Sequence, residues 1–239
     1  MKNKRVIYET DPSAEWYTPR HLRELATEIL HGVDLDPATC AENPIGASAF
    51  LTAADGLPSV ELWASRLPLD VAGKEAPSVF LNPPYGRETS DWLAMLEALH
   101  GLRECNSLAL VPCRPGSRWY TRATGPEGFD LVCELHGRVS FDTRNAAGVI
   151  VAGKVPARWA CVLLYRGGPY ASALGLRWMR DKLARVGSVR LSGRARRLRA
   201  RRGTHARQGR PRTPADPRQV PLWPTNVIPM QPSKKGKRP

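Results

Sequence analysis

The sequence lacks the features that mark metal-binding, secreted or membrane-spanning proteins. Its five cysteines are widely spaced and form no CxxC pair, and its five histidines do not fall at metal-ligand spacing. The N-terminal segment has no apolar core typical of a signal peptide, and the longest apolar run, at residues 159–165, is too short to cross a bilayer. We therefore expect a cytoplasmic protein with reduced thiols and no bound metal ion.

Acidic residues are scarce in the last part of the chain. Residues 188–239 hold fifteen Lys or Arg but a single acidic residue, Asp216, so this segment accounts for the net charge of +14 and the pI of about 10.1. It also contains eight of the 22 prolines and shows no apolar periodicity, which is typical of a disordered segment. The sequence predicts a folded domain over residues 1–187 and a disordered Arg/Pro-rich basic tail over 188–239, suited to a polyanionic partner.

Apolar runs with β-branched residues alternate with amphipathic helical patterns, which is typical of an α/β fold. Thr18 and Gly32 are expected to bound the first helix, whose apolar face comprises Leu22, Leu25, Ala26, Ile29 and Leu30. Short Gly-containing loops join the later strands, which predicts an antiparallel far edge of a mixed sheet. We expect helices at 18–32, from near residue 90, and at 171–186 with Gly187 as its cap; the expected strands are 33–36 (stopped by Pro37), 78–81, 107–112, 131–135, 138–141 and 158–165.

The tetrapeptide Asn82-Pro83-Pro84-Tyr85 directly follows the predicted strand 78–81. Ligand sites of open α/β sheets lie outside the carboxyl ends of the strands. Two consecutive prolines fix the backbone and offer no N–H donor, so the amide oxygen of Asn82 and nearby carbonyls are expected to face outward as acceptors. With the flat ring of Tyr85 beside them, these acceptors suit a planar conjugated amine. The purely structural alternative is a rigid turn after a strand.

Several segments together resemble the phage-type DNA N-6-adenine methyltransferase family, whose members use S-adenosylmethionine. The resemblance implies a class I methyltransferase fold, a Rossmann-like mixed sheet with helices on both faces. One departure lies after Pro37, where residues 38–41 replace the Gly-rich turn of the wider methyltransferase pattern. The likeness covers roughly residues 15–165 and rests on the segments 15–19 (EWYTP), 34–39 (DLDPAT), 50–52 (FLT) with 55–57 (DGL), 81–85 (LNPPY), 111–114 (VPCR) with 118–119 (RW), and 137–141 (GRVSF).

The resemblance also implies where the cofactor binds. The segment that begins at Trp16 is similar to the family's N-terminal cofactor segment, and the segment at Asp34 to its first cofactor motif at a strand end. Asp55 is a candidate for the adenine or ribose end of the cofactor, with an exposed turn residue as the alternative. The candidate cofactor-binding residues are Trp16, Tyr17, Thr18, Pro19, Asp34, Asp36, Pro37 and Asp55.

Cations and aromatic rings after the strand at 107–112 and in the segment at 137–141 suggest phosphate contact or base stacking. The alternative for Trp119 is a place in the core, and for Arg138 a structural role. The candidate nucleic-acid-binding residues are Arg114, Arg118, Trp119 and Arg138.

These observations lead to one expected function and to alternatives. We expect site-specific methyl transfer from S-adenosylmethionine to the exocyclic amine of adenine in DNA, in bacterial host cytoplasm if the gene is carried by a phage. The target adenine would be flipped from the duplex, stacked on Tyr85 and held at its amine by Asn82 and the Pro83 carbonyl. The alternatives are amino-group methylation of RNA or of a protein glutamine, and a non-catalytic nucleic-acid-binding protein.

Overall fold

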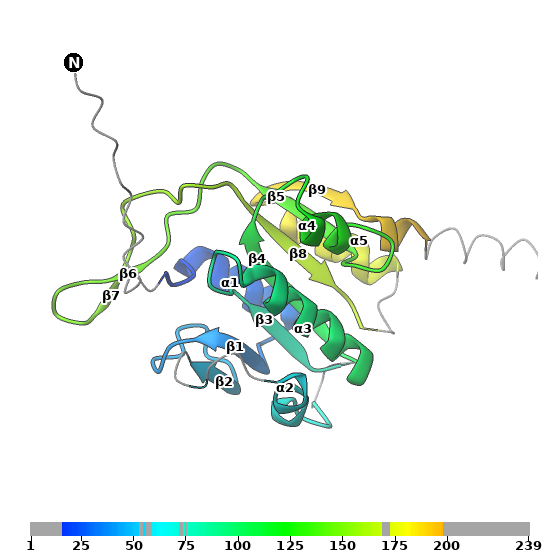
Figure 1. Cartoon of the computed structure of the whole chain (residues 1–239), viewed down its shortest axis with the longest axis horizontal. Helices are drawn as coiled ribbons and strands as arrows, with labels where there is room; N and C mark the ends of the chain where they lie inside the picture. The colour runs from blue at the N-terminus through cyan, green and yellow to red at the C-terminus, as the bar shows by residue number, and fades with distance from the viewer. Residues whose placement is uncertain are drawn as a thin grey trace, which may run out of the picture. The chain divides into compact units, whose positions relative to one another are not determined.

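A seven-stranded mixed sheet forms the centre of the computed structural model, which describes residues 16–52, 55, 59–71, 74, 76–168 and 173–197 (Figure 1). The strand order is β2-β1-β3-β4-β8-β5-β9. The predicted α/β class is confirmed, and the predicted disorder of 198–239 lies outside the described residues. The sheet strands are β1 (Leu35–Thr39), β2 (Ala49–Thr52), β3 (Ser78–Leu81), β4 (Asn106–Pro112), β5 (Leu131–Leu135), β8 (Cys161–Arg166) and β9 (Gly187–Leu191).

Helices cover both faces of this sheet, because side chains alternate between two apolar layers along each strand. In β3, Phe80 faces the layer that includes α1 and α5, whereas Val79 and Leu81 face the layer with α2, α3 and α4. Side chains of neighbouring strand residues thus pack into the apolar layers on opposite faces, so the sheet is buried on both sides. The helices are α1 (Arg20–Leu30), α2 (Val60–Arg66), α3 (Thr89–Leu102), α4 (Arg118–Ala123) and α5 (Ala173–Leu183).

Strand directions place several loops at one edge of the sheet. Strands β2, β1, β3 and β4 are parallel, and β8 is antiparallel to both β4 and β5, so β5 runs in the direction of β4. We call the edge where these five strands end the carboxyl edge, and the edge where they begin the amino edge. The chain passes from β1 outward to β2 and then returns to the other side of β1 as β3. The β1–β3 pair is therefore a topological switch point, where ligand crevices form in such sheets.

The first helix confirms the sequence pattern except at its start. Its five predicted apolar residues are all buried. The N-cap is Pro19, not Thr18: the Pro19 carbonyl accepts from the Leu22 and Arg23 amides, and the Thr18 side chain makes no cap hydrogen bond. Gly32 ends the helix as expected, with a φ of 89° and its amide donating to the Thr27 carbonyl.

Two predicted strands differ in the structure. Strand β1 does not stop at Pro37 but continues to Thr39, because its pairing with β2 shifts between Asp36 and Thr39 and leaves the proline nitrogen outside the ladder. Residues 138–141 form no strand; Gly137 turns the chain with a φ of 73°. A hairpin follows instead, with strands β6 (Thr143–Arg144) and β7 (Ile150–Val151).

The folded sheet extends past the predicted domain boundary at residue 187. Gly187 is not a helix cap but the first residue of β9, which pairs antiparallel with β5. A Cβ there would meet the Glu134 carbonyl oxygen at 2.4 Å, so the close approach of the two strands requires glycine. The composition of 188–197 resembles the basic tail, yet these residues belong to the sheet and to the turn after it.

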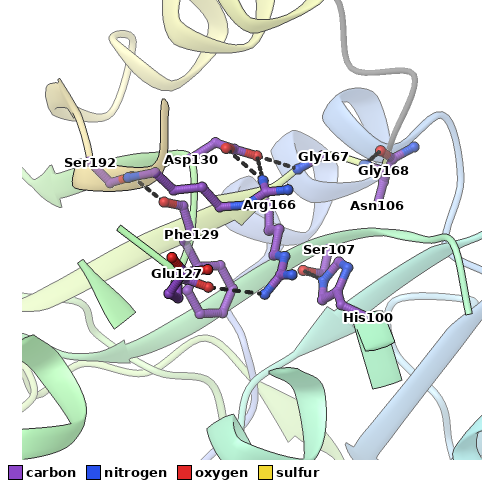
Figure 2. A network of polar contacts seen from close by, with 11 residues as sticks. His100, Asn106, Ser107, Glu127, Phe129, Asp130, Arg166, Gly167, Gly168 and Ser192 are labelled. Carbon is purple, nitrogen blue, oxygen red and sulfur yellow. Dashed lines mark hydrogen bonds and ion pairs between the residues drawn. The ribbon is translucent and has the colours of Figure 1, made fainter. Parts of the chain in front are cut away.

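Polar contacts anchor this C-terminal segment at the amino edge (Figure 2). The buried carboxylate of Asp130 accepts two hydrogen bonds from Arg194, at 2.7 and 2.8 Å, and one from the Gly167 amide at 2.9 Å. Burial raises the pKa of Asp130, and Arg194 opposes that rise. Three of the arginines that composition assigned to the tail, Arg190, Arg194 and Arg197, form ion pairs with Glu134, Asp130 and Glu127.

Candidate active site

The carboxyl edge brings together most of the residues that the sequence singled out. Asp36 lies in β1, Asp55 follows β2, Asn82 follows β3, Arg114 follows β4 and Arg138 follows β5. Since these five strands end at the same edge, residues up to about a hundred positions apart in sequence share one face of the fold. Asp36 and Asn82 belong to the two adjacent strands of the switch point.

Asn82 presents an acceptor that has no partner. Its Nδ2 donates to the Trp16 carbonyl at 3.4 Å, which fixes the orientation of the amide. Its Oδ1 is buried and accepts no hydrogen bond. Five buried side-chain polar atoms lack a partner in the described part of the chain, and Asn82 Oδ1 is the only acceptor among them. A buried oxygen without a donor costs free energy that a ligand N–H would recover.

The two prolines leave a second acceptor next to Asn82. Within the described residues, no hydrogen bond to the Pro83 carbonyl is found, whereas the Pro84 carbonyl accepts from the Thr89 hydroxyl at 3.1 Å. The same hydroxyl accepts from the Gly86 amide at 3.1 Å. Buried Thr89, at the start of α3, thus holds the loop after β3 in place. The sequence analysis did not single out Thr89, although a hydroxyl at the first turn of a helix is a recognised bracing signal.

Tyr85 is anchored by its hydroxyl rather than free to rotate. The hydroxyl donates to the Leu110 carbonyl in β4 at 3.3 Å and lies 3.9 Å from the Cys161 sulfur. Burial raises the pKa of Tyr85 well above its ordinary value, so the hydroxyl stays protonated. The ring remains partly exposed and meets the ring of Phe141 edge-on, at 5.6 Å between centroids.

Trp16 completes an aromatic wall around the asparagine. Its ring lies 5.5 Å from that of buried Phe141, which also contacts Tyr85. Trp16 is 41% exposed, and its carbonyl is the partner of the Asn82 amide. The wall of Trp16, Phe141 and Tyr85 is therefore a row of contacting rings that begins at the residue bound to the Asn82 amide. Planar rings stack on flat apolar surfaces of this kind.

Asp36 is a buried carboxyl group at the switch point. Burial raises its pKa to about 7, while the Ala38 amide, which donates to Oδ1 at 3.1 Å, and the Thr39 hydroxyl act in the opposite direction. A buried carboxyl group with a strongly raised pKa is typical of a binding or catalytic position. A ligand hydroxyl or amino group that donates to it would stabilise its ionised form.

Asp34 lies apart from the other predicted cofactor residues. It precedes β1 at the amino edge, where its Oδ2 accepts from the Ser78 amide, the Ser78 hydroxyl and Lys74 Nζ, each at 2.8 Å. This carboxylate joins the start of β1 to the start of β3. Its place and its partners indicate a structural role and separate it from Asp36, only two residues further along.

Asp55 lies at the carboxyl edge but is exposed. Its Oδ2 accepts from the Thr52 amide at 2.7 Å and from the Thr52 hydroxyl at 3.0 Å. These bonds lower the pKa of Asp55 and close a turn after β2. Both proposed roles for this residue are therefore compatible with its position, as a turn residue and as a ligand contact.

The other residues of the predicted N-terminal cofactor segment are buried. Tyr17 pairs with Asp142 through two backbone hydrogen bonds of 2.9 Å, and Thr18 and Pro19 lead into α1. The Tyr17 hydroxyl accepts from Arg144 Nη2 at 2.7 Å. In this segment Trp16 is the residue that contacts Asn82, through a hydrogen bond from Asn82 Nδ2 to its carbonyl oxygen. Residues 1–15, including Glu15, lie outside the described part of the chain.

The predicted nucleic-acid contacts divide into two groups. Arg114, Arg118 and Arg138 are exposed, and the Arg114 guanidinium lies 5.1 Å from the centre of the Trp159 ring. Trp119 is partly buried, packs against the core beneath α4 and meets Tyr120 edge-on at 5.6 Å. The core alternative weighed for Trp119 is therefore the better supported one.

Arg144 and Glu42 are functional candidates that sequence reasoning missed. Arg144, in β6, binds both carboxylate oxygens of Glu42, in the loop after β1, at 2.6 and 3.0 Å. This contact lowers the pKa of Glu42 to about 2. The two residues are 102 positions apart, so no local pattern in the sequence could have joined them.

Comparison with known proteins adds no family to this picture: no protein-family model matches the chain, and no curated protein is significantly similar to it. None of the described helices is long and apolar enough to cross a membrane. Among the described residues, no cluster of three or more His, Cys, Asp or Glu could hold a metal ion.

Proposed function

We propose that this chain is an S-adenosylmethionine-dependent methyltransferase of class I fold that acts on the exocyclic amine of adenine in DNA. The observation that carries the proposal is the buried, unpaired Oδ1 of Asn82, next to the uncommitted Pro83 carbonyl. Two acceptors side by side can hold the two hydrogens of an NH₂ group. The aromatic wall of Trp16, Phe141 and Tyr85 then suits a flat, conjugated base.

The proposed fold and cofactor are supported by the switch point between β1 and β3. Helices on both faces and parallel strands that diverge from this point are what a Rossmann-like cofactor site requires. The buried carboxyl of Asp36, whose pKa is raised to about 7, fits a ligand that carries hydroxyl and amino donors, as S-adenosylmethionine does. Asp36 would hold the cofactor.

S-adenosylmethionine supplies a methyl group on a positively charged sulfur, which makes the methyl carbon electrophilic. Asn82 Oδ1 and the Pro83 carbonyl would orient the target amine so that its nitrogen lone pair points at that carbon. As the N–C bond forms, the C–S bond breaks and S-adenosylhomocysteine leaves as a neutral thioether, and the methylated amine then loses a proton to water. Neither oxygen is a strong base, so the rate gain comes from orientation and from exclusion of water by the aromatic wall. Tyr85, held by its hydroxyl, is rigid enough to keep a stacked base in register.

The target base must leave the duplex to reach these acceptors. Asn82 Oδ1 is buried at the end of β3, so an adenine still stacked between its neighbours could not contact it. Exposed Arg114 and Arg138 at the same edge would bind phosphates and position the strand. Phosphate contacts provide affinity, whereas the acceptor pair selects the amine.

The test is methylation of unmethylated duplex DNA by the purified full chain with labelled S-adenosylmethionine, followed by nucleoside analysis for N6-methyladenine. Asn82→Ala should lower the rate at least about a hundredfold, because it removes an acceptor aimed at the reacting group. Asn82→Asp, which keeps an acceptor oxygen, should retain more activity than Asn82→Ala. Asn106→Ala is the matched control, because Asn106 is the corresponding amide at the amino edge.

Two outcomes would contradict the proposal. The first is full activity in Asn82→Ala. The second is loss of cofactor binding, measured by calorimetry, in Asn82→Ala, because Asn82 is assigned to the target amine and not to the cofactor. Wild-type protein that binds the cofactor but methylates only RNA or a glutamine peptide would replace adenine in DNA as the substrate.

A further inference from the structure

The hairpin β6–β7 and the chain that follows it extend away from the sheet (Figure 1). We call residues 143–156 the arm. Nearly all of its residues are exposed, and three valines account for much of its apolar surface: Val149 is 57% exposed, Val151 37% and Val155 80%. Exposed apolar side chains gathered on a projecting element are typical of an interaction surface.

The arm is rigid in construction. The Asn145 side chain accepts from the amides of Ala147 and Val149 at 3.0 and 2.9 Å, which closes the tip. At the base, a Cβ on Gly153 would meet the Phe141 carbonyl oxygen at 1.7 Å, so the two chain segments approach as closely as glycine allows. A rigid two-stranded ribbon loses little conformational freedom on binding.

Charge favours a polyanionic partner for the arm. Residues 143–158 contain Arg144, Lys154 and Arg158 but no Asp or Glu. Asp142 is paired with Arg23, at 3.4 Å, and the charge of Arg144 is balanced by Glu42, at 2.6 Å, so the net positive charge comes from Lys154 in the arm and Arg158 just beyond it. The surface is therefore apolar and cationic together, which matches duplex DNA, whose major groove displays thymine methyl groups between rows of phosphates.

The base of the arm adjoins the candidate active site. Asp142 pairs with Tyr17, and Phe141 contacts the rings of both Trp16 and Tyr85. A partner that runs along the arm to its base therefore reaches the rings of Trp16, Phe141 and Tyr85. The partner of the arm and the carrier of the target amine should be the same molecule.

We propose that the arm docks in the major groove of B-form duplex DNA, with Val149, Val151 and Val155 against base edges. This inference rests on the proposed function and specifies its substrate. The B-form major groove is about 12 Å wide and admits a two-stranded β-ribbon, and it is the groove that displays the adenine amine and the thymine methyl. The major groove of A-form RNA is too deep and narrow for side chains to read, so double-stranded RNA is excluded.

The test is equilibrium binding of the full chain to a labelled DNA duplex and to the RNA duplex of the same sequence, at about 0.2 M salt to weaken nonspecific phosphate contacts. Val149→Asp and Val155→Asp should each weaken DNA binding about tenfold, because they place a carboxylate against the duplex. Leu69→Asp is the matched control: Leu69 is 92% exposed and lies in the connection to the amino end of β3. It should leave DNA affinity unchanged.

Each possible result decides for or against the arm. Equal affinity of the valine variants and wild type for DNA would overturn the inference, as would equal binding of the two duplexes with equal weakening in the variants. Arm-dependent binding to anionic phospholipid vesicles, with none to DNA, would replace the duplex by a membrane surface. Arm-dependent DNA binding without any methylation would support the inference while contradicting the proposed function, so the two can fail separately.

Discussion

The two edges of the sheet use their polar residues in opposite ways. At the amino edge, Asp34 and Asp130 each accept three hydrogen bonds, and Asn106 accepts from the Gly168 amide at 2.8 Å. At the carboxyl edge, Asn82 Oδ1 is unpaired, and within β1 Asp36 is a buried carboxyl with a strongly raised pKa. Satisfied groups stabilise the fold, and unsatisfied groups are kept where a ligand can complete them.

His100, at the amino edge, is a titratable residue that burial keeps neutral and to which we assign no role in binding or catalysis. Its Nε2 lies 2.8 Å from the Ser107 hydroxyl, and burial lowers its pKa well below the ordinary value, so the ring stays neutral (Figure 2). Burial also raises the pKa of the neighbouring Cys105 to about 12, which leaves that thiol unreactive. This buried histidine beside a cysteine makes only a core contact. Asp36, in contrast, is a buried group that we assign to the candidate site.

The largest expected effect is the loss of stability when the contacts at the amino edge are removed by truncation. A chain ending at residue 187 would lose β9 and leave the Asp130 carboxylate buried without Arg194, a cost of about 3–5 kcal/mol against a typical total stability of about 5–15 kcal/mol. We expect it to be unfolded or molten by circular dichroism. A chain ending at residue 201 keeps all of these contacts and is the control; equal melting temperatures for the two truncations would contradict the anchoring role of β9.

Deleting residues 202–239 should lower the affinity for DNA without changing which adenines are methylated. This segment holds nine Lys or Arg and one Asp, and the described chain ends at the amino edge, where Arg197 pairs with Glu127. Removing the cations should weaken DNA binding and make the slope of log affinity against log salt shallower, by about 0.9 for each phosphate that the shortened chain no longer neutralises. Target preference, mapped by sequencing methylated adenines, should persist. An altered preference would assign base reading to the tail.

Asp36→Asn should change how stability depends on pH. The pKa of Asp36 is about 7 in the fold, against an ordinary value of 3.8, so the wild type loses stability as pH rises from about 4 to 7 and the buried group ionises. The variant should be more stable than wild type above pH 7, by up to about 4 kcal/mol, and equal to it below pH 4. It should also bind S-adenosylmethionine more weakly.

Urea denaturation at a series of pH values measures the effect of Asp36→Asn, and calorimetry measures the cofactor. Asp55→Asn is the control, because the pKa of this exposed carboxyl is lowered by Thr52 and its pH effect should have the opposite sign. Wild-type stability that is flat between pH 4 and 7 would remove Asp36 as the titrating group.

The smallest expected effect is that of Tyr85→Phe. This change removes one hydrogen bond, to the Leu110 carbonyl, and should cost roughly 1 kcal/mol in stability while methylation falls only a few-fold. Tyr85→Ala, which also removes the ring packed on Phe141, should reduce methylation far more. Similar rates for the two variants would show that the ring does not stack on the target. Steady-state rates on one oligonucleotide provide the comparison.

The predictions from sequence succeeded where a local pattern determines the structure. The apolar face of α1 follows a 3.6-residue period, and β3 and β5 have the predicted bounds. Strand β9 was missed because its exposed positions alternate with partly buried ones in a segment as rich in arginine as the tail, so composition concealed the period of two. The predicted antiparallel far edge of the sheet is confirmed, although residues 136–160, and not a short loop, join β5 to β8.

Residues of the candidate site were harder to place, because a site depends on which strand ends meet. Asn82 could be predicted from its position after an apolar strand. Asp34 and Asp36 look equivalent in sequence, but β1 begins at Leu35, so Asp34 lies before the strand, bound to the start of β3, whereas Asp36 lies within the strand. The pair Arg144 and Glu42 joins segments 102 residues apart, and only the fold brings them together.

The contacts of Arg144 would also couple the two proposed binding events, of cofactor and of DNA. One guanidinium holds Glu42 in the loop after β1, the Tyr17 hydroxyl next to Trp16, and the Gly148 carbonyl at the tip of the arm. A ligand that shifts Glu42 or Tyr17 must therefore shift the arm, and an occupant of the arm must act back on that ligand with the same coupling free energy. Duplex DNA would then change the affinity for the cofactor by a certain factor. The cofactor would change the affinity for duplex DNA by that same factor.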